Sequence, residues 1–118
     1  MSFNKILMEL TIKLGAKGAA ILDAEGETVD IYTELPEFEL DFIGARTGLI
    51  LPLLEKATTN LNKGRVKSLG ITTQRLRIAI STIQDGYFLL VATAPEKPLT
   101  RTILESEKTV KGLVAEMG

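Results

Sequence analysis

The sequence contains no cysteine and no histidine. Without cysteine it can form no disulfide framework and no thiolate nucleophile. Without either residue, Ser-His-Asp and Cys-His catalytic systems and the usual zinc sites are also excluded. An enzyme built from this chain would have to rely on carboxylates, lysine or tyrosine. We therefore predict no catalytic residue, no metal site and no cofactor, and a protein that is not an enzyme.

The sequence also has little charge imbalance, few aromatics and no long apolar run. Lys and Arg total 14 against 15 Asp and Glu, and aromatic residues make up only 5%, which argues against nucleic acid as a partner. No run reaches the roughly 20 apolar residues of a membrane span, so direct membrane insertion is not expected. Lys5 and Glu9 interrupt the N-terminal apolar residues, unlike a signal peptide. We expect a cytoplasmic protein with one domain over residues 1–118.

The stretch Leu76 to Ala94, LRIAISTIQDGYFLLVATA, is typical of two strands joined by a turn at Asp85-Gly86. A two-residue turn there pairs Ile83 with Phe88 and Ile80 with Val91. Both faces of this hairpin are then apolar, whereas a hairpin with one solvated side alternates apolar with charged residues. The hairpin therefore predicts a sheet covered by helices on both faces.

Residues on either side of this hairpin supply the other elements. Apolar spacing predicts an amphipathic first helix that ends at Gly15 and a last helix that begins at Pro98 or Leu99. The remaining patterns predict a first hairpin, a long helix and a third strand, at Lys17–Asp23 with Glu27–Thr33, Pro36–Asn62 and Arg65–Thr73. The fold class is α+β, with a five-stranded antiparallel sheet and helices on both faces. The elements follow the order α-β-β-α-β-β-β-α, and we expect one helix on one face of the sheet and two on the other.

The long helix is more apolar than one sheet face can cover. Gly44 and Gly48 leave one side without side chains, and Pro52 either kinks the helix or splits it. In one interpretation, the glycines only let the helix lie close to its own sheet. In the other, the helix is apolar on two sides because it also meets a partner, for which a second copy of the chain is the simplest choice.

Two charged groups have alternative interpretations. The acidic residues around Asp23 and Glu25 resemble a calcium loop superficially, but they lack the ligand spacing of an EF-hand and suit a solvated hairpin tip. Lys63, Arg65 and Lys67 alternate along the third strand, and Arg75 and Arg77 along the next. They form either an anion or partner patch, or a charged edge strand that discourages stray pairing. A two-residue turn at Thr73-Gln74 would place the two basic sets on opposite faces.

Over essentially its whole length the chain resembles the Roadblock/dynein light-chain family, in particular its bacterial MglB-like members. The resemblance rests on the element order and on three segments, GAAILDAEGETVDIY, FELDFIGARTGLILPLLEKAT and LRIAISTIQDGYFLLVATA. It implies a homodimer formed through the long helix and the third strand, so that two sheets join edge to edge. On this sequence the implied dimer interface comprises Gly44, Gly48, Leu51, Glu55, Arg65, Lys67 and Leu69.

The resemblance further implies a scaffold that binds a small Ras-like GTPase, with a role in GTPase activation or localisation. Our first hypothesis is therefore a non-enzymatic homodimeric regulator. The alternative is a small-ligand-sensing or general protein-interaction module, which an apolar cavity between the last helix and the sheet, or a ligand that raises the melting temperature, would favour. An enzyme that uses lysine or carboxylate chemistry is the third hypothesis.

Overall fold

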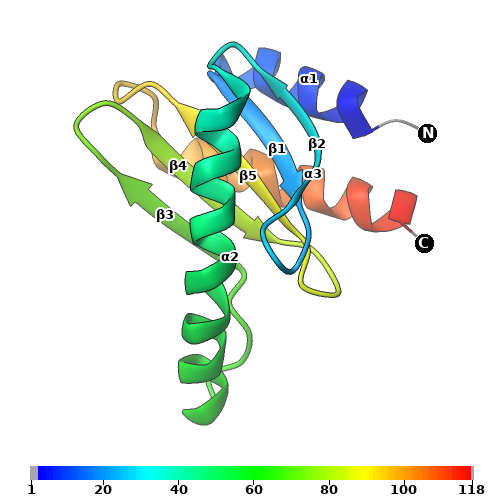
Figure 1. Ribbon diagram of the computed structural model, residues 1–118, viewed down its shortest axis with the longest axis vertical. Coiled ribbons are helices and arrows are strands. Elements are labelled where there is room, and N and C mark those ends of the chain that lie inside the picture. The colour runs from blue at the N-terminus through cyan, green and yellow to red at the C-terminus, as the bar shows by residue number, and fades with distance from the viewer. Residues whose placement is uncertain (1–2, 118) are drawn as a thin grey trace.

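A five-stranded antiparallel sheet forms the centre of the computed structural model, which describes residues 3–117. The chain runs through α1 (Phe3–Leu14), β1 (Gly18–Leu22), β2 (Thr28–Thr33), α2 (Glu37–Asn60), β3 (Ser68–Thr72), β4 (Arg77–Thr82), β5 (Phe88–Thr93) and α3 (Leu99–Met117) (Figure 1). The strands lie in the order β2-β1-β5-β4-β3. This arrangement confirms the predicted fold class and element order.

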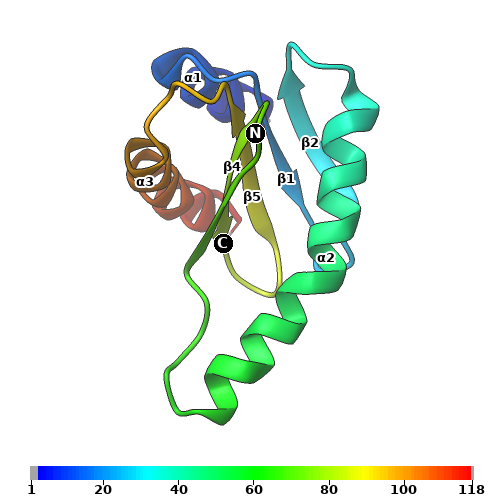
Figure 2. The ribbon, with the colours of Figure 1, turned by 90° about the vertical axis from the view of Figure 1, so that its left-hand side faces the viewer.

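Helices cover both faces of the sheet, as the apolar hairpin predicts. Helices α1 and α3 lie on one face and α2 lies on the other (Figure 2). The core on the first face joins the apolar stripes of both helices to β1 and β5, through Leu7, Leu10, Leu113, Ile21, Leu89 and Val91. The core under α2 consists mainly of Leu40, Leu51, Leu22, Ile78, Ile80, Phe88 and Leu90.

The Asp85-Gly86 turn forms as predicted, but the register of the hairpin differs by one residue. Both turn residues have positive φ, 55° and 82°, as a type I′ turn requires, and the Tyr87 N–H donates to the Gln84 carbonyl at 3.0 Å. The Ile83 N–H, however, donates to the Tyr87 carbonyl at 2.8 Å. Ile83 and Gln84 thus both oppose Tyr87, which is a β-bulge.

Because of this bulge, Ile80 pairs with Leu90 and not with Val91. Ile80 consequently faces α2 together with Leu90, whereas Val91 faces the α1 and α3 layer. The predicted pairing was wrong because Ile80, Leu90 and Val91 are all aliphatic, so their side chains do not distinguish between the two registers.

Helix α2 is one continuous helix that contains Pro52. Figure 2 shows that the helix changes direction along its length. Proline has no N–H to donate to the carbonyl of the residue four positions earlier, here Gly48, which is the usual cause of such a bend. Pro52 thus kinks the helix and does not split it.

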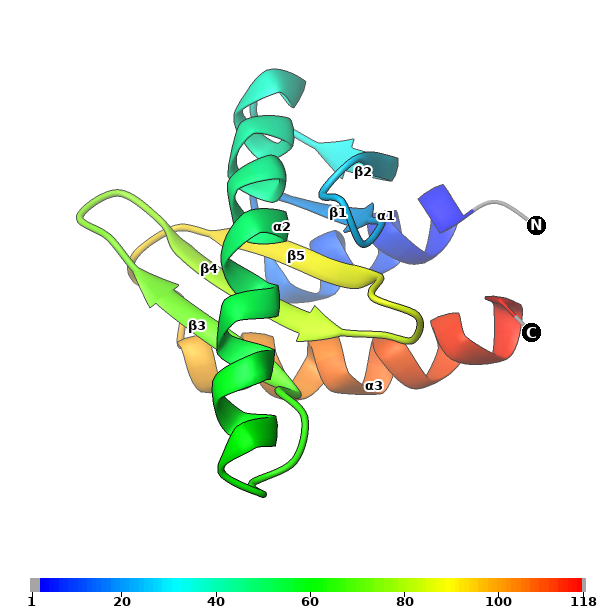
Figure 3. The ribbon, with the colours of Figure 1, turned by 60° about the horizontal axis from the view of Figure 1, so that its bottom comes forward.

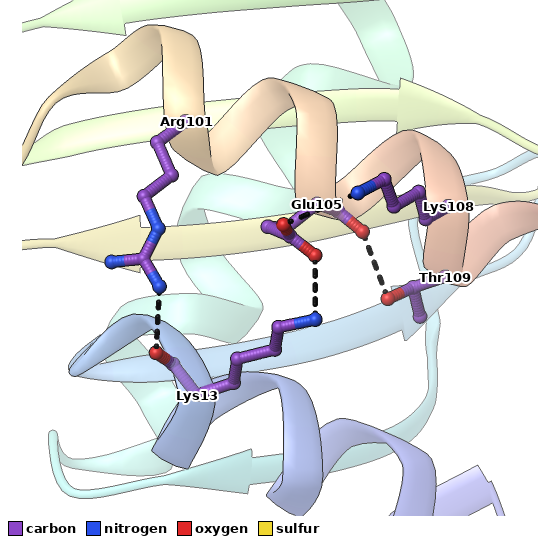
Figure 4. Close-up of polar contacts among 5 residues, drawn as sticks. All are labelled: Lys13, Arg101, Glu105, Lys108 and Thr109. Atoms are coloured by element: carbon purple, nitrogen blue, oxygen red, sulfur yellow. Dashed lines mark hydrogen bonds and ion pairs between the residues drawn. The ribbon is translucent and has the colours of Figure 1, made fainter.

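An ion pair and a hydrogen bond join the two helices on the first face, and a second ion pair lies within α3 (Figure 4). Lys13 Nζ lies 2.9 Å from Glu105 Oε1, Lys108 Nζ lies 3.6 Å from Glu105 Oε2, and Arg101 donates to the Lys13 carbonyl at 3.3 Å. The hydrogen bond from Lys13 is the main cause that lowers the pKa of the Glu105 carboxyl below its ordinary value. No helix within residues 3–117 is long and apolar enough to span a membrane.

Candidate protein-interaction surface

One side of α2 is buried against its own chain. Its buried residues recur at helical spacing and include small side chains, Leu40, Gly44, Thr47, Gly48 and Leu51. A Cβ atom at Gly48 would lie 2.8 Å from the backbone Cα and N of Gly26, in the turn between β1 and β2. A Cβ at Gly44 would overlap the Leu22 side chain. The two glycines therefore allow α2 to approach the β1–β2 hairpin of the same protomer.

The rest of α2 exposes large apolar side chains. We call them the outer α2 surface; it consists of Phe38, Phe42, Leu49, Ile50, Leu53, Leu54 and Leu61, the last at the C-cap. Phe38, Leu49 and Leu53 are 66–70% exposed. Elsewhere in the described chain only Ile12, Val29 and Leu104 are large, apolar and exposed, so exposure of this kind is concentrated on one helix.

The outer α2 surface extends beyond the sheet. No residue of α2 after Leu51 is buried, and the last turns of the helix project past the strands (Figures 1 and 3). Near the other end, the Arg46 guanidinium lies over the Phe42 ring at 4.8 Å, and both residues remain exposed. A contiguous apolar surface of this extent is typical of a protein-interaction site.

The edge strand β3 lies next along the chain. It pairs with β4 on one side only, so its other edge offers unpaired backbone groups among the described residues. The predicted strand Arg65–Thr73 was too long: Arg65 and Lys67 precede β3, whose five residues, SLGIT, carry no charge. Charged residues commonly protect an exposed edge from pairing, and β3 lacks that protection.

The basic residues near β3 do not form one patch. Arg65 Nε lies 3.6 Å from Glu55 Oε2, and Arg77 donates to the Lys97 carbonyl at 2.8 Å. The turn before β4 is centred on Gln74-Arg75, not on Thr73-Gln74, because the Thr73 N–H donates to the Leu76 carbonyl. Lys67 is exposed and its carbonyl accepts from the Thr82 N–H at 3.0 Å. The structure thus gives several of these residues roles within the protomer.

The residues of the implied interface fall into two groups. Gly44, Gly48 and Leu51 lie on the buried side of α2, so they cannot contact another molecule in this conformation. Glu55 and Arg65 form the ion pair that joins α2 to the segment before β3, Lys67 is exposed, and Leu69 is half-buried beneath α2. The interface itself stays a prediction, and the sequence did not single out the outer α2 surface.

A signal for the outer surface was present in the sequence. Phe38, Phe42, Leu49 and Leu53 recur at helical spacing on the side opposite Gly44 and Gly48. Small residues on one side of a helix and large apolar residues on the other indicate two different neighbours.

The acidic hairpin tip gives no comparable signal for a metal site. No group of three or more possible metal ligands gathers anywhere within residues 3–117.

Comparison with known proteins supports the fold. No protein-family model matches the chain, and no curated protein matches it in sequence. Among solved structures, MglB of Myxococcus xanthus superposes with a TM-score of 0.87 at 12% identity, over 98% of this chain and 94% of that chain. A Roadblock/LC7 domain of Streptomyces avermitilis gives 0.87 at 17% identity, over 99% and 98%.

An MglB structure with a tetrameric arrangement gives a TM-score of 0.83 at 16% identity, over 94% of this chain and 84% of that chain. Each match extends over nearly the whole chain and preserves the order of its elements. The protein thus has the Roadblock fold, as its resemblance to that family implies.

Proposed function

We propose that this protein is a non-enzymatic, homodimeric cytoplasmic scaffold that binds a small Ras-like GTPase. In the proposed dimer, the outer α2 surfaces of two copies pack together, and their β3 strands pair along the free edges. The apolar positions of α2 that remain exposed in the dimer form the platform for the GTPase.

The outer α2 surface is the observation that carries the proposal. Its seven side chains are exposed although they are the kind that a protein normally buries, and covering them with a second copy removes them from water. The uncharged β3 edge supports the same arrangement, because no cation lies on the strand to repel its symmetry mate. Since α2 leads directly into β3, one symmetric contact can include both.

The GTPase assignment is supported by the fold and by the lack of catalytic groups. The chain shares its fold with MglB, the bacterial Roadblock protein on which our expectation of a GTPase partner is based. A tetrameric arrangement has been described for one matched MglB, and self-association is part of our proposal for this chain. A scaffold needs no nucleophile, general base or metal of its own, in agreement with the absence of histidine and cysteine.

Self-association is tested by light scattering after gel filtration at several tens of micromolar. The wild type should elute with twice the 12.8 kDa chain mass, and Leu53→Asp should elute as a monomer. Ile12→Asp is the matched control, because Ile12 is 66% exposed against 69% for Leu53 but lies on α1 at the opposite face. A monomeric wild type, or equal effects of both variants, would contradict the proposed interface.

GTPase binding is tested with a Ras-like GTPase from the same source, loaded with GDP or with a slowly hydrolysed GTP analogue. Anisotropy of the labelled GTPase should rise with wild-type protein and respond to the bound nucleotide, and Phe42→Asp should weaken the response. Phosphate release in the presence of GTP then separates activation from localisation: a faster rate indicates activation, and an unchanged rate with binding indicates localisation. No binding of either form would exclude the GTPase as the partner.

The alternative, a small-ligand-sensing or general protein-interaction module, has one specific observation in its favour. A groove lies between the last helix and the sheet, in the place where the alternative expects an apolar cavity, but charged as well as apolar side chains line it. Such a groove is compatible with a scaffold that also responds to a ligand.

A further inference from the structure

A groove of about 530 Å³ separates α3 from the end of β4 and from the segment that precedes β3. This volume lies within the range of roughly 300–1,000 Å³ that small-molecule sites occupy. The groove is on the face opposite α2, so it is distinct from the outer α2 surface. It is bounded by one protomer alone and needs no second copy for its walls.

Ser81 on β4 is 1% exposed and belongs to the lining of this groove. Its Oγ forms no hydrogen bond with any other described residue. Buried polar groups in folded proteins are nearly always hydrogen-bonded, because an unpaired hydroxyl loses its water without compensation. An acceptor placed in the groove would satisfy it, so Ser81 points to a ligand with hydrogen-bonding oxygens.

The charges around the groove favour an anion. Four cationic side chains and one carboxylate, Glu107, contribute to its lining. Arg65 and Lys108 already have acidic neighbours outside the lining, at 3.6 Å each. Lys67 and Lys111 form no ion pair within the described chain.

The Lys111 ammonium is free because a pair expected from the sequence does not form. Glu107 and Lys111 are four residues apart on α3, a spacing that predicts an exposed ion pair. No such pair occurs among the salt bridges of residues 3–117. Lys111 and Lys67 therefore remain available to an anionic group in the groove.

Apolar side chains complete the lining. Leu104 and Val110 on α3 line the groove together with Val66 and Ile83, and Leu104 is 54% exposed. An inorganic ion would leave these side chains in water, whereas an alkyl or aryl group would cover them. The ligand chemistry therefore has two parts, an oxyanion and an apolar body.

We propose that this groove binds a small amphiphilic anion. Its carboxylate or phosphate head accepts a hydrogen bond from Ser81 Oγ and lies near the Lys67 and Lys111 ammonium groups. Its apolar body lies along Leu104 and Val110. Binding here would give the scaffold a second, ligand-responsive site on the face opposite the outer α2 surface.

Binding is tested by titrating the 118-residue protein, labelled with ¹⁵N, with octanoate or with octyl phosphate below its micelle concentration. Neutral octanol is the control. We expect saturable shifts at Ser81, Leu104 and Lys111 with at least one anion, together with a higher melting temperature. Comparison of the two anions distinguishes a carboxylate head from a phosphate head. No saturation by either anion up to millimolar concentration, equal binding of octanol, or shifts confined to α2 would overturn the proposal.

Two variants test the assignment of the head group. Ser81→Ala should weaken binding roughly tenfold through loss of a hydrogen bond to a charged group. Without ligand, the melting temperature of this variant should be no lower than that of the wild type, since the hydroxyl that it lacks is unpaired. Lys111→Gln should weaken binding about two- to fivefold. Lys56→Gln, an exposed change on α2, should have no effect. Wild-type affinity in both groove variants would overturn the assignment.

The outcome is separable from that of the proposed scaffold function. The groove belongs to one protomer, so Leu53→Asp should bind the anion as wild type does, even where it no longer self-associates. Failure of anion binding in a protein that dimerises and binds a GTPase would exclude the groove alone.

Discussion

Because α2 lies close to the β1–β2 turn, we expect substitution of two helical glycines to affect stability differently. Gly48 in α2 and Gly112 in α3 both lie in helix interiors, where alanine is normally the better residue. A Cβ at Gly112 would meet no atom within 4 Å, whereas a Cβ at Gly48 would lie 2.8 Å from the Gly26 backbone. The same substitution should therefore have opposite effects at the two positions.

The expected magnitudes follow from two opposing contributions. Replacing an interior helical glycine by alanine stabilises by about 1 kcal/mol, and Gly112→Ala should show this gain in the free energy of unfolding. At Gly48 the new methyl group also forces apart two packed backbones, a type of overpacking that costs about 1–3 kcal/mol. The upper part of that range applies because Gly26 has φ of +82° and is fixed by its turn. Gly48→Ala should then lose about 1–2 kcal/mol overall.

Urea unfolding followed by circular dichroism measures both variants against wild type. All samples need the same protein concentration, since self-association would contribute to apparent stability. If the slope of the unfolding free energy against urea concentration is unchanged, the urea midpoint should rise for Gly112→Ala and fall for Gly48→Ala. Equal stabilisation of both variants would refute the packing of α2 on the hairpin. Loss of self-association without loss of protomer stability in Gly48→Ala would instead place the glycine side in the dimer interface.

Two further perturbations concern polar contacts. Lys13→Gln should lower stability more at pH 7 than near pH 3. Lys13 holds the Glu105 pKa below its ordinary value, so the contact stabilises above the usual carboxyl pKa of about 4.3 and is lost as pH falls through the lowered one. Urea midpoints at the two pH values measure this, and an equal deficit at both would argue against the pair. Asp23→Ala removes the Oδ1 atom that accepts from the Glu25 and Glu27 N–H groups at 2.9 and 3.0 Å. This change should lower the free energy of unfolding by about 1 kcal/mol. Asp23→Asn keeps an acceptor and should lower it by less.

Most of the fold could be predicted because its signals are local. The spacing of apolar residues predicted the bounds of α1, and the Asp85-Gly86 pair predicted the position of the turn. The register of β4 against β5 depends on a bulge at Ile83-Gln84, which no residue type in the hairpin signals. The length of β3 depends on β4, which ends at Thr82. The Thr82 N–H still donates to the Lys67 carbonyl, but Lys63 and Arg65 lie beyond the end of that strand.

The candidate site was only partly predictable, for a physical reason. Small residues at Gly44 and Gly48 show that some backbone approaches α2 closely, but they do not show whose backbone it is. The resemblance to a dimeric family assigned that backbone to a second copy, whereas in the structure it belongs to the β1–β2 hairpin. The excess of apolar side chains on α2 was recognised, and the structure determines which of them are exposed.

We also expect the exposed end of α2 to be unstable without a partner. Residues from Pro52 to Asn60 include no buried side chain, and Pro52 leaves the Gly48 carbonyl without its helical donor. A helical segment this short, without packing, is below the roughly 12–15 residues at which isolated helices become even marginally stable in water. Contacts made by a partner would provide the missing stabilisation.

Hydrogen exchange tests this directly, because opening of a short helix exposes its amides. Amides of residues 53–60 should be protected at concentrations where the protein self-associates, and should exchange quickly on dilution and in Leu53→Asp. Amides of β1 and β5, buried at the centre of the sheet, serve as the internal reference and should stay protected throughout. Strong protection of residues 53–60 in a demonstrated monomer would mean that the helix end is stable alone, and the main physical reason for a partner on α2 would be lost.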